Sequence, residues 1–231
     1  MAALAVTGDG SDEVDADRQA EMTAPGPAGP PAGVLFDLDG VLLRSEEVWF
    51  RLVEEAGRRF RGTPITRKEF TPTFGQGTEA DIRGFRLSCN AAQLDRYYAE
   101  NFQRYAGEVW VDPEARPTLE ALAKRKVRRA VVTNTTTLLA GSLLARAELL
   151  DLVEMVACAD QVTRAKPEPD VVLHALKGLN LQPAEAWMVG DSRYDRTAAE
   201  AAGVHYVGLR MDGAARVESL AGVLGLLDPA P

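Results

Sequence analysis

Short apolar runs alternate with longer amphipathic stretches along most of the chain. The first run, Val34-Leu35-Phe36, is bounded by turn residues and ends directly in Asp37, a pattern typical of a buried strand. Runs of the same kind recur at residues 129–133, 155–158, 186–190 and 204–208. Helical periodicity precedes or follows each run, which indicates βαβ units. The sequence therefore predicts an α/β fold whose core is a doubly wound, Rossmann-like parallel sheet covered by helices on both faces.

One long segment interrupts this alternation, because it contains helical patterns but no convincing strand. The helical patterns cover residues 46–60, 78–87 and 91–105. We therefore expect an inserted helical domain at residues 44–112, with the core at residues 33–43 and 113–231. Four aromatic side chains fall at helical spacing in its last helix: Tyr97, Tyr98, Phe102 and Tyr105. We expect them to form the core of a small helical bundle rather than a surface on which bases stack.

Composition separates the first residues from the rest of the chain. Residues 1–32 hold six acidic residues and one basic residue, Arg18, and they end in a stretch rich in proline and glycine. Such a segment cannot bury a core, so we predict a disordered acidic leader at residues 1–32. The leader lacks the basic start and long apolar centre of a signal peptide, which argues against a targeting role.

The remaining composition excludes several classes of protein. Of the formal net charge of −8, most belongs to the leader, and no basic stripe of the kind that follows a nucleic-acid backbone is present. Apolar runs stay well short of the ~18 residues that a membrane span needs. The two cysteines, Cys89 and Cys158, are too few for a disulfide framework and lie outside any zinc-binding pattern. We expect a cytoplasmic protein, a monomer or homodimer, without nucleic-acid or membrane partners.

Polar residues follow the predicted strands at the points where these strands end. The carboxyl ends of parallel strands meet at one edge of a sheet, which is where ligands bind in such folds. The residues concerned are Asp37-Leu38-Asp39-Gly40, Thr133-Asn134, Lys166-Pro167, and Gly190-Asp191-Ser192 with Asp195 beyond. We expect these groups to form one site.

The chemistry of these groups is that of a phosphate and metal site. Two carboxylates spaced by one residue, Asp37 and Asp39, point the same way on an extended chain, so their charge requires a cation. Asp191 would add a third carboxylate, and hard oxygen ligands of this kind select Mg²⁺, which also binds substrate phosphate. Thr133 supplies a hydroxyl, Asn134 and its neighbours supply N–H donors, and Lys166 supplies a positive charge for phosphate oxygens.

Each motif by itself has a simpler explanation. An Asp-x-Asp at a strand end is most often turn and cap chemistry, and Lys-Pro or Gly-Asp-Ser commonly occurs in loops and at helix starts. The occurrence of all of them in order, each after an apolar strand, favours a catalytic site.

These motifs resemble those of the haloacid dehalogenase superfamily. The resemblance covers nearly everything from Val34 onward and rests on Asp37-Leu38-Asp39-Gly40-Val41-Leu42, Thr133-Asn134, Lys166-Pro167-Glu168-Pro169-Asp170 and Gly190-Asp191-Ser192-Arg193-Tyr194-Asp195. Residues 198–203 are also similar to the helix after the fourth motif in phosphoglycolate phosphatases and their relatives. The insertion resembles the α-helical cap of that subfamily.

The resemblance implies a Mg²⁺-dependent phosphatase acting on a small phosphorylated metabolite, with phosphoglycolate as the family-weighted substrate. It implies that Asp37 attacks phosphorus to form an aspartyl-phosphate, while Asp39 protonates the leaving oxygen and later deprotonates water. It also implies that the Asp39 backbone carbonyl is a metal ligand beside Asp37 and Asp191. Asp195 is expected either to complete the metal shell or to hold Lys166.

The cap offers further candidates. Gly75-Gln76-Gly77, followed by Thr78 at a helix start, is equally consistent with a substrate-specificity loop and with a plain turn and helix cap. Arg83 and Arg86 are candidates for contacts to a substrate carboxylate or second phosphate, although solvated helix charges are the simpler interpretation. Both histidines, His174 and His205, are expected inside a helix and a strand and are poor catalytic candidates.

Two alternatives stay open. Hexose-phosphate mutases of this family use a cap histidine where this chain has Val48 and Trp49, which weakens the mutase alternative. Arg44 also precedes Ser45 where relatives often carry an aspartate, so a contact at the cap hinge is expected to differ. Dehalogenases replace the second aspartate, which is present here, and Lys68 is an unpersuasive Schiff-base lysine for phosphonate cleavage. The other class is a non-catalytic binding protein that keeps this fold.

Overall fold

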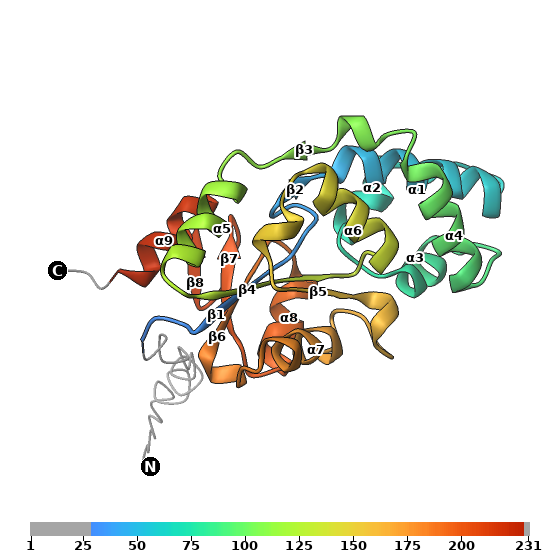
Figure 1. The fold of residues 1–231 in the computed structure, drawn as a ribbon. Helices are drawn as coiled ribbons and strands as arrows, with labels where there is room; N and C mark the ends of the chain where they lie inside the picture. Colours follow the sequence, from blue (N-terminus) through green and yellow to red (C-terminus); the bar gives the residue numbers. More distant parts are fainter. Residues whose placement is uncertain (1–28, 229–231) are drawn as a thin grey trace, which may run out of the picture.

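The computed structural model describes residues 29–228 (Figure 1). The leader predicted at residues 1–32 therefore lies almost entirely outside the described residues. The part of it that is described leads into the sheet, because the Ala32 N–H donates to the carbonyl of Glu185 at 2.8 Å.

A six-stranded parallel sheet forms the core. Its strands are β1 (Gly33–Phe36), β4 (Arg128–Thr133), β5 (Met155–Cys158), β6 (Ala186–Gly190), β7 (His205–Leu209) and β8 (Ala215–Val217). They lie in the order β5-β4-β1-β6-β7-β8. The chain thus places β4 and then β5 on one side of β1, and then β6, β7 and β8 on the other side. The predicted doubly wound sheet is confirmed, with its switch point beside β1.

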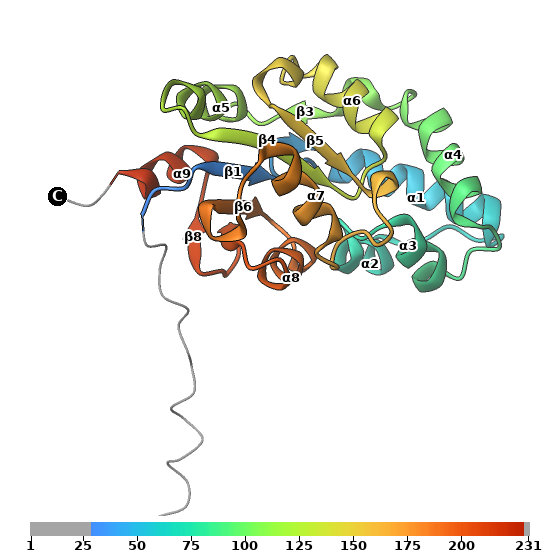
Figure 2. The ribbon, with the colours of Figure 1, turned by 60° about the horizontal axis from the view of Figure 1, so that its bottom comes forward.

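Helices cover both faces of this sheet, as Figure 2 shows. On one face lie α5 (Ala115–Lys124), α6 (Thr137–Arg146) and α9 (Leu220–Leu227), and on the other lie α7 (Asp170–Leu179) and α8 (Arg193–Ala201). The sequence of β1 is continuously apolar because helices cover the strand on both sides. Val34 and Phe36 pack into one hydrophobic cluster and Leu35 into the other, and all three are fully buried.

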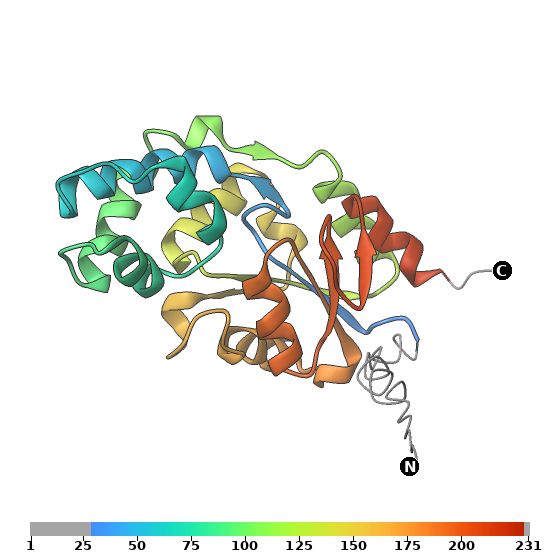
Figure 3. The same cartoon turned by 180° about the vertical axis from the view of Figure 1, so that it is seen from behind.

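The inserted segment forms a helical cap beyond the carboxyl ends of the strands (Figures 1 and 3). Its helices are α1 (Glu46–Phe60), α2 (Arg67–Phe70), α3 (Thr78–Phe85) and α4 (Ala91–Phe102). The aromatic residues of α4 behave as the sequence predicts, since Tyr98 and Phe102 are buried and Tyr97 packs against them from a partly buried position. The cap therefore has a hydrophobic core that is continuous with one face of the sheet.

A short antiparallel ribbon joins the cap to the core. It consists of β2 (Leu43–Arg44) and β3 (Trp110–Val111), each only two residues long. The Arg44 guanidinium pairs with the Asp112 carboxylate at 3.1 Å, so an ion pair links the two chain crossings. This pair lies where the chain passes between the core and the inserted helices.

Most predicted elements are confirmed, and the differences have local causes. Helix α3 ends at Phe85, two residues early, because Arg86 takes a left-handed backbone conformation with φ of 56°. Helix α4 ends at Phe102, three residues earlier than predicted, and a 3₁₀ turn follows at Ala106–Glu108. Strands β2, β3 and β8 were not predicted, because two or three residues are too few to show a period. The 3₁₀ turns are Thr71–Thr73, Ala106–Glu108, Leu150–Leu152, Ala159–Gln161 and Pro183–Glu185. Across residues 29–228, every helix is too short or too polar to cross a membrane.

Candidate active site

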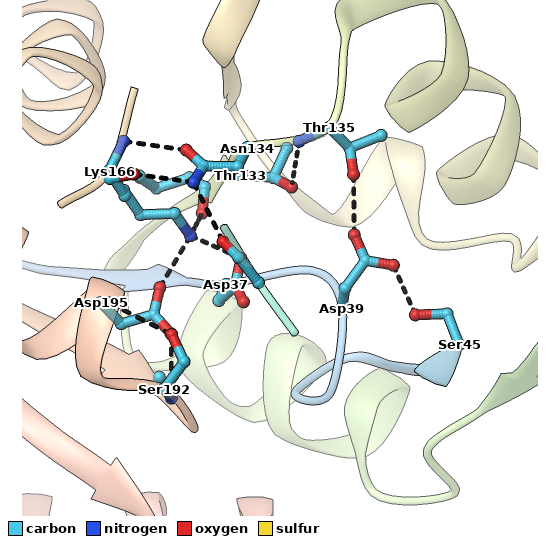
Figure 4. A network of polar contacts seen from close by, with 12 residues as sticks. Asp37, Asp39, Ser45, Thr133, Asn134, Thr135, Lys166, Ser192 and Asp195 are labelled. Atoms are coloured by element: carbon cyan, nitrogen blue, oxygen red, sulfur yellow. Dashed lines mark hydrogen bonds and ion pairs between the residues drawn. The ribbon is translucent and has the colours of Figure 1, made fainter. Parts of the chain in front are cut away.

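The polar ends of β1, β4 and β6 meet the loop before α7 at one edge of the sheet (Figure 4). Lys166 lies at the centre of this meeting point and is almost fully buried. Its Nζ donates to Asp37 Oδ1 and Asp195 Oδ1, both at 2.7 Å, and to the carbonyl of Val132 at 3.0 Å. All three ammonium hydrogens therefore have acceptors, which holds this cation in a single position.

Asp195 is fixed from two directions. It is the third residue of α8, and its Oδ2 accepts hydrogen bonds from the backbone N–H of Ser192 at 3.1 Å and from the Ser192 hydroxyl at 2.5 Å. The Ser192 hydroxyl in turn accepts from the Asp195 N–H, which completes a capping box at the start of α8. The other carboxylate oxygen of Asp195, Oδ1, pairs with Lys166 Nζ. The geometry thus joins Asp195 to Lys166, one of the two roles expected for it.

Three carboxylates converge beside Lys166. One oxygen from each of Asp37, Asp191 and Asp195 lies within 4.8 Å of the other two. Gly40 permits this approach, because a Cβ there would lie 1.9 Å from Asp191 Oδ2. With one lysine among three acids, the cluster keeps an excess of negative charge in a buried place, and this donor set suits a hard divalent cation.

The buried charge displaces the pKa values of these groups. Burial and, after it, the neighbouring Asp195 carboxylate raise the pKa of Asp191 to about 7 against the opposing effect of Lys166. Burial and then Asp195 also raise the pKa of Asp37. Burial alone would lower the pKa of Lys166, but Asp195 and Asp37 outweigh it and raise that pKa. A bound cation would relieve the crowding of the carboxylates, so the residues present fit a metal ion.

Asp39 has different neighbours, although only one residue separates it from Asp37. The chain turns after Leu38, so the two carboxylates do not lie side by side on an extended strand as the spacing suggested. Asp39 Oδ1 accepts from Ser45 Oγ at 2.5 Å and from Trp49 Nε1 at 2.9 Å, and Oδ2 accepts from Thr135 Oγ1 at 2.8 Å. Sequence reasoning missed these three donors, since nothing in their local pattern distinguishes them.

The end of β4 supplies two residues in different ways. Thr133 is buried and its hydroxyl oxygen accepts from the Thr135 N–H at 3.0 Å, which leaves the hydroxyl hydrogen free to donate. The side chain of Asn134 is instead engaged within the protein. Its Nδ2 donates to the carbonyls of Gly75 and Lys166 at 3.0 and 2.9 Å, and its Oδ1 accepts from the Lys166 N–H at 2.9 Å. Both amide hydrogens of Asn134 are therefore used within the protein, and only its backbone N–H is left to donate to a ligand.

The cap loop at residues 75–77 contacts the core directly. Gly75 lies beside Ser192 with φ of +88°, a conformation that favours glycine. Gly77 lies against Ala165 and Asn134, and a Cβ there would be 3.3 Å from the Ala165 Cβ, a tight contact. Gly77 is also the N-cap of α3. Gly75 and Gln76 line a cavity between cap and core, together with Asp37, Asp39, Thr133 and Asn134. Residues 75–77 thus lie at the predicted site, and the last of them also precedes the first turn of α3.

Two other candidates lie elsewhere. Arg83 pairs with Glu79 at 3.6 Å, and both side chains are more than 70% exposed. Arg86 is also exposed, so neither arginine is among the residues that line the cavity. The histidines lie in α7 and β7, away from the cavity.

Comparisons with known proteins agree with this fold and site. A sequence model of the haloacid dehalogenase-like hydrolases matches residues 31–203. A phosphoglycolate phosphatase from Nitrosospira multiformis is 39% identical over 188 residues, which cover 76% of this chain and 82% of that protein. The crystal structure of CbbY from Rhodobacter sphaeroides in complex with phosphate is 25% identical, covers 86% of this chain and 99% of that one, and has a TM-score of 0.74.

A β-phosphoglucomutase structure from Clostridium difficile also has a TM-score of 0.74, covering 83% of this chain and 92% of that one. At 16% identity it supports the fold alone.

An α/β sheet with a helical cap over buried carboxylates and a lysine agrees with an enzyme that hydrolyses phosphate esters. The chain belongs to the haloacid dehalogenase-like hydrolases and is a phosphatase of that family.

Proposed function

We propose that this phosphatase hydrolyses a small phosphomonoester through an aspartyl-phosphate, with Mg²⁺ as cofactor. The observation that carries the proposal is the position of Asp37, which ends β1, lines the cavity and is held by Lys166 in the carboxylate cluster. A fixed carboxylate at the floor of a cavity is placed to attack a phosphorus atom above it.

The first half-reaction follows from this placement. An Asp37 oxygen forms a bond to phosphorus while the bond between phosphorus and the leaving oxygen breaks. Lys166, the Thr133 hydroxyl and the backbone N–H groups after β4 stabilise the phosphate oxygens on which charge develops. Bound Mg²⁺ would be held by Asp37, Asp191 and the Asp39 carbonyl, and it would offset the repulsion between carboxylate and phosphate. Asp195 would keep Lys166 in place.

Asp39 would act as general acid in the first half-reaction and as general base in the second. Its protonated carboxyl group gives a proton to the leaving oxygen. The resulting carboxylate then takes a proton from the water that attacks the aspartyl-phosphate and releases inorganic phosphate. Ser45 and Thr135 hydroxyls can donate or accept, so they can contact Asp39 with or without its proton, whereas the Trp49 indole can only donate. These contacts orient the carboxylate within the cavity.

We also propose that residues 44–112 act as the cap and residues 33–43 and 113–231 as the catalytic body. The contacts of Gly75 and Gly77 with the core support this division, because they close the cavity over Asp37. A closed cap would exclude bulk water from the reacting phosphoryl group.

The mutase alternative has less support. A mutase must return a proton and phosphoryl group to a sugar, and the family's cap histidine for this task is replaced here by Val48 and Trp49. Trp49 reaches Asp39, but its indole nitrogen cannot accept a proton. Hydrolysis by water is the simpler outcome at this site.

A phosphoenzyme assay tests the proposal. Wild-type protein and the Asp37→Asn variant are mixed with an aryl phosphate and Mg²⁺, quenched rapidly in acid, and assayed for hydroxylamine-labile phosphate. We expect labelled wild type, activity abolished by EDTA, and no labelled Asp37→Asn, because an amide is a very poor nucleophile. Phosphate bound covalently to the variant, or wild-type protein inactive with Mg²⁺, would contradict the proposal. Inactivity would favour the non-catalytic binding protein.

A further inference from the structure

The cavity between cap and core has a chemical character of its own. It encloses about 60 Å³, with the Asp37 end at the core and the other end within the cap. The cap end is formed by α1, α3, α4 and the loop that contains Gln76. If Asp37 takes the phosphoryl group, as proposed above, the cap end receives the organic part of the substrate.

Two further carboxylates face this cap end. Asp81 is about nine-tenths buried, and Asp95 is half-buried with its Oδ1 accepting from Thr78 Oγ1 at 2.5 Å. Among the described residues that line the cavity, none is lysine, arginine or histidine. The cap end therefore offers no cation to an anionic substrate group.

Asp81 is held in place by two donors. Gln76 Nε2 donates to Asp81 Oδ1 at 2.8 Å, and the Tyr98 hydroxyl donates to Oδ2 at 2.9 Å. Each carboxylate oxygen has capacity for a second hydrogen bond. Asp81 can therefore still accept from a ligand hydroxyl without losing the contacts that hold it.

The arginines that could have countered these acids face outward. Arg83 lies in α3 close to Asp81 in sequence, but it pairs with Glu79 on the exposed surface. The lining of the cavity also includes the apolar side chains of Val53, Phe74 and Leu139. A lining that combines acceptors with apolar side chains suits an alcohol or sugar, whose hydroxyls donate and whose carbons pack.

We propose that the substrate's organic part is uncharged and bears hydroxyl groups, and that this site discriminates against phosphomonoesters with a carboxylate or a second phosphate. The physical reason is electrostatic. A substrate carboxylate in this end would lose its water and face like charges without a counterion, which costs more than the same approach by a hydroxyl. A phosphorylated polyol or sugar fits better than phosphoglycolate.

Matched substrate pairs test this proposal. The two-carbon pair is 2-hydroxyethyl phosphate and phosphoglycolate, and the three-carbon pair is glycerol 3-phosphate and 3-phosphoglycerate. Phosphate release with Mg²⁺ gives kcat/KM for each at about pH 8.5, above the pKa of about 7 that burial gives Asp81, so that this carboxylate is ionised. An aryl phosphate is the reference for catalysis. We expect the neutral member of a pair to exceed the carboxylated member by about 10-fold or more, from like-charge repulsion of this kind.

Variants then assign the discrimination to the cap. Asp81→Asn keeps the size of the side chain and an oxygen acceptor but removes the charge, so the ratio of neutral to carboxylated kcat/KM should fall several-fold. Asp95→Asn should lower the ratio in the same direction, which keeps the test available if Asp81→Asn fails to fold. Glu79→Gln is the matched control, because Glu79 lies in the same helix but on its exposed face. This control should leave the ratio unchanged.

The outcomes separate this inference from the proposed function. Failure to hydrolyse even the aryl phosphate would remove the function itself. An active enzyme that prefers the carboxylated members, or that hydrolyses neither neutral member, would overturn the inference and leave the function standing. A ratio that does not move in either folded Asp variant would likewise overturn it.

Discussion

The indole N–H of Trp49 donates to Asp39 Oδ1 at 2.9 Å, so a residue of the first cap helix holds a carboxylate in the first loop of the core. The Trp49 ring is itself held by edge contacts with Tyr98 and Phe102, with ring centroids 5.3 and 5.2 Å away. Packing within the cap and orientation of the proposed acid/base are therefore linked through one side chain.

Replacing Trp49 by phenylalanine tests this link. The ring contacts remain, but the donor to Asp39 is lost, and we expect kcat to fall by about 10-fold, equivalent to ~1.4 kcal/mol. The fall should be larger for alkyl than for aryl phosphates, because only alkyl leaving groups depend strongly on protonation. Trp110→Phe is the control, since Trp110 is 74% exposed. Equal losses with both leaving groups would show that Trp49 acts only on cap stability.

Asp39→Asn should separate the two half-reactions. The variant keeps Asp37 and the backbone of the loop but loses proton transfer, a contribution of about 10²–10⁴-fold. With an aryl phosphate the first step should be relatively spared, so phosphoenzyme should accumulate while its hydrolysis lags. Rapid-quench measurement of both steps checks this. Leaving-group dependence identical to that of wild type would remove Asp39 from the acid/base role.

Asp191→Asn should weaken metal binding without removing the nucleophile. We expect lower activity at a given Mg²⁺ concentration and partial recovery as Mg²⁺ is increased, because the carboxylate is proposed to bind metal without reacting. A titration of activity against Mg²⁺, with direct calorimetric measurement of metal binding, checks this. A variant with the wild-type Mg²⁺ requirement and turnover would exclude Asp191 from the metal site.

Gly40→Ala should damage the site through steric contact. The added Cβ would lie 1.9 Å from Asp191 Oδ2, at a residue whose φ is already +89°. We expect activity to fall by more than about 10²-fold, since misplacement by about 1 Å has effects of that size. Gly62→Ala separates strain from collision, because Gly62 has φ of +79° with no atom within 4 Å of the added Cβ. The control should cost only ~1–2 kcal/mol of stability and keep turnover. Similar turnover in both variants would contradict the collision.

The buried cap carboxylate should make stability depend on pH. Burial, with a smaller contribution from the nearby Asp95, raises the pKa of Asp81 to about 7 against the lowering effects of the hydrogen bonds from Gln76 and Tyr98. In the unfolded chain its pKa returns to about 3.9. Between these values the folded state binds more protons than the unfolded state, so stability falls as pH rises from ~4 to ~7.

The Asp81→Asn variant isolates this contribution. As pH rises across that range, we expect the free energy of unfolding of the wild type to fall relative to that of the variant by at most ~1.4 kcal/mol per pH unit. Above that range the difference between the two proteins should level off. Urea unfolding at several pH values measures it, with Glu79→Gln as the control. A pH-independent difference would show that Asp81 is not protonated in the folded cap.

By itself, the sequence determined the layers of the fold and the list of motif residues. Strands that are buried on both faces must be continuously apolar, so β1, β4, β5, β6 and β7 stand out as runs. Polar residues follow β1, β4 and β6, and a parallel sheet brings these strand ends to one edge. The helices α1, α3 and α4 were likewise predicted within a few residues at their ends, because amphipathic periodicity is a local signal.

Only the tertiary structure decided which groups surround each catalytic side chain. Trp49 reaches Asp39 from α1, Ser45 from the N-cap of α1 and Thr135 from the loop after β4. No local pattern marks these residues, because their contact depends on how the cap folds back over the sheet. The same holds for Asp81, whose sequence neighbourhood is that of an ordinary helix acid. It becomes a buried carboxylate facing the cavity only when α3 and α4 pack together, since burial is a property of the packed chain and not of a segment.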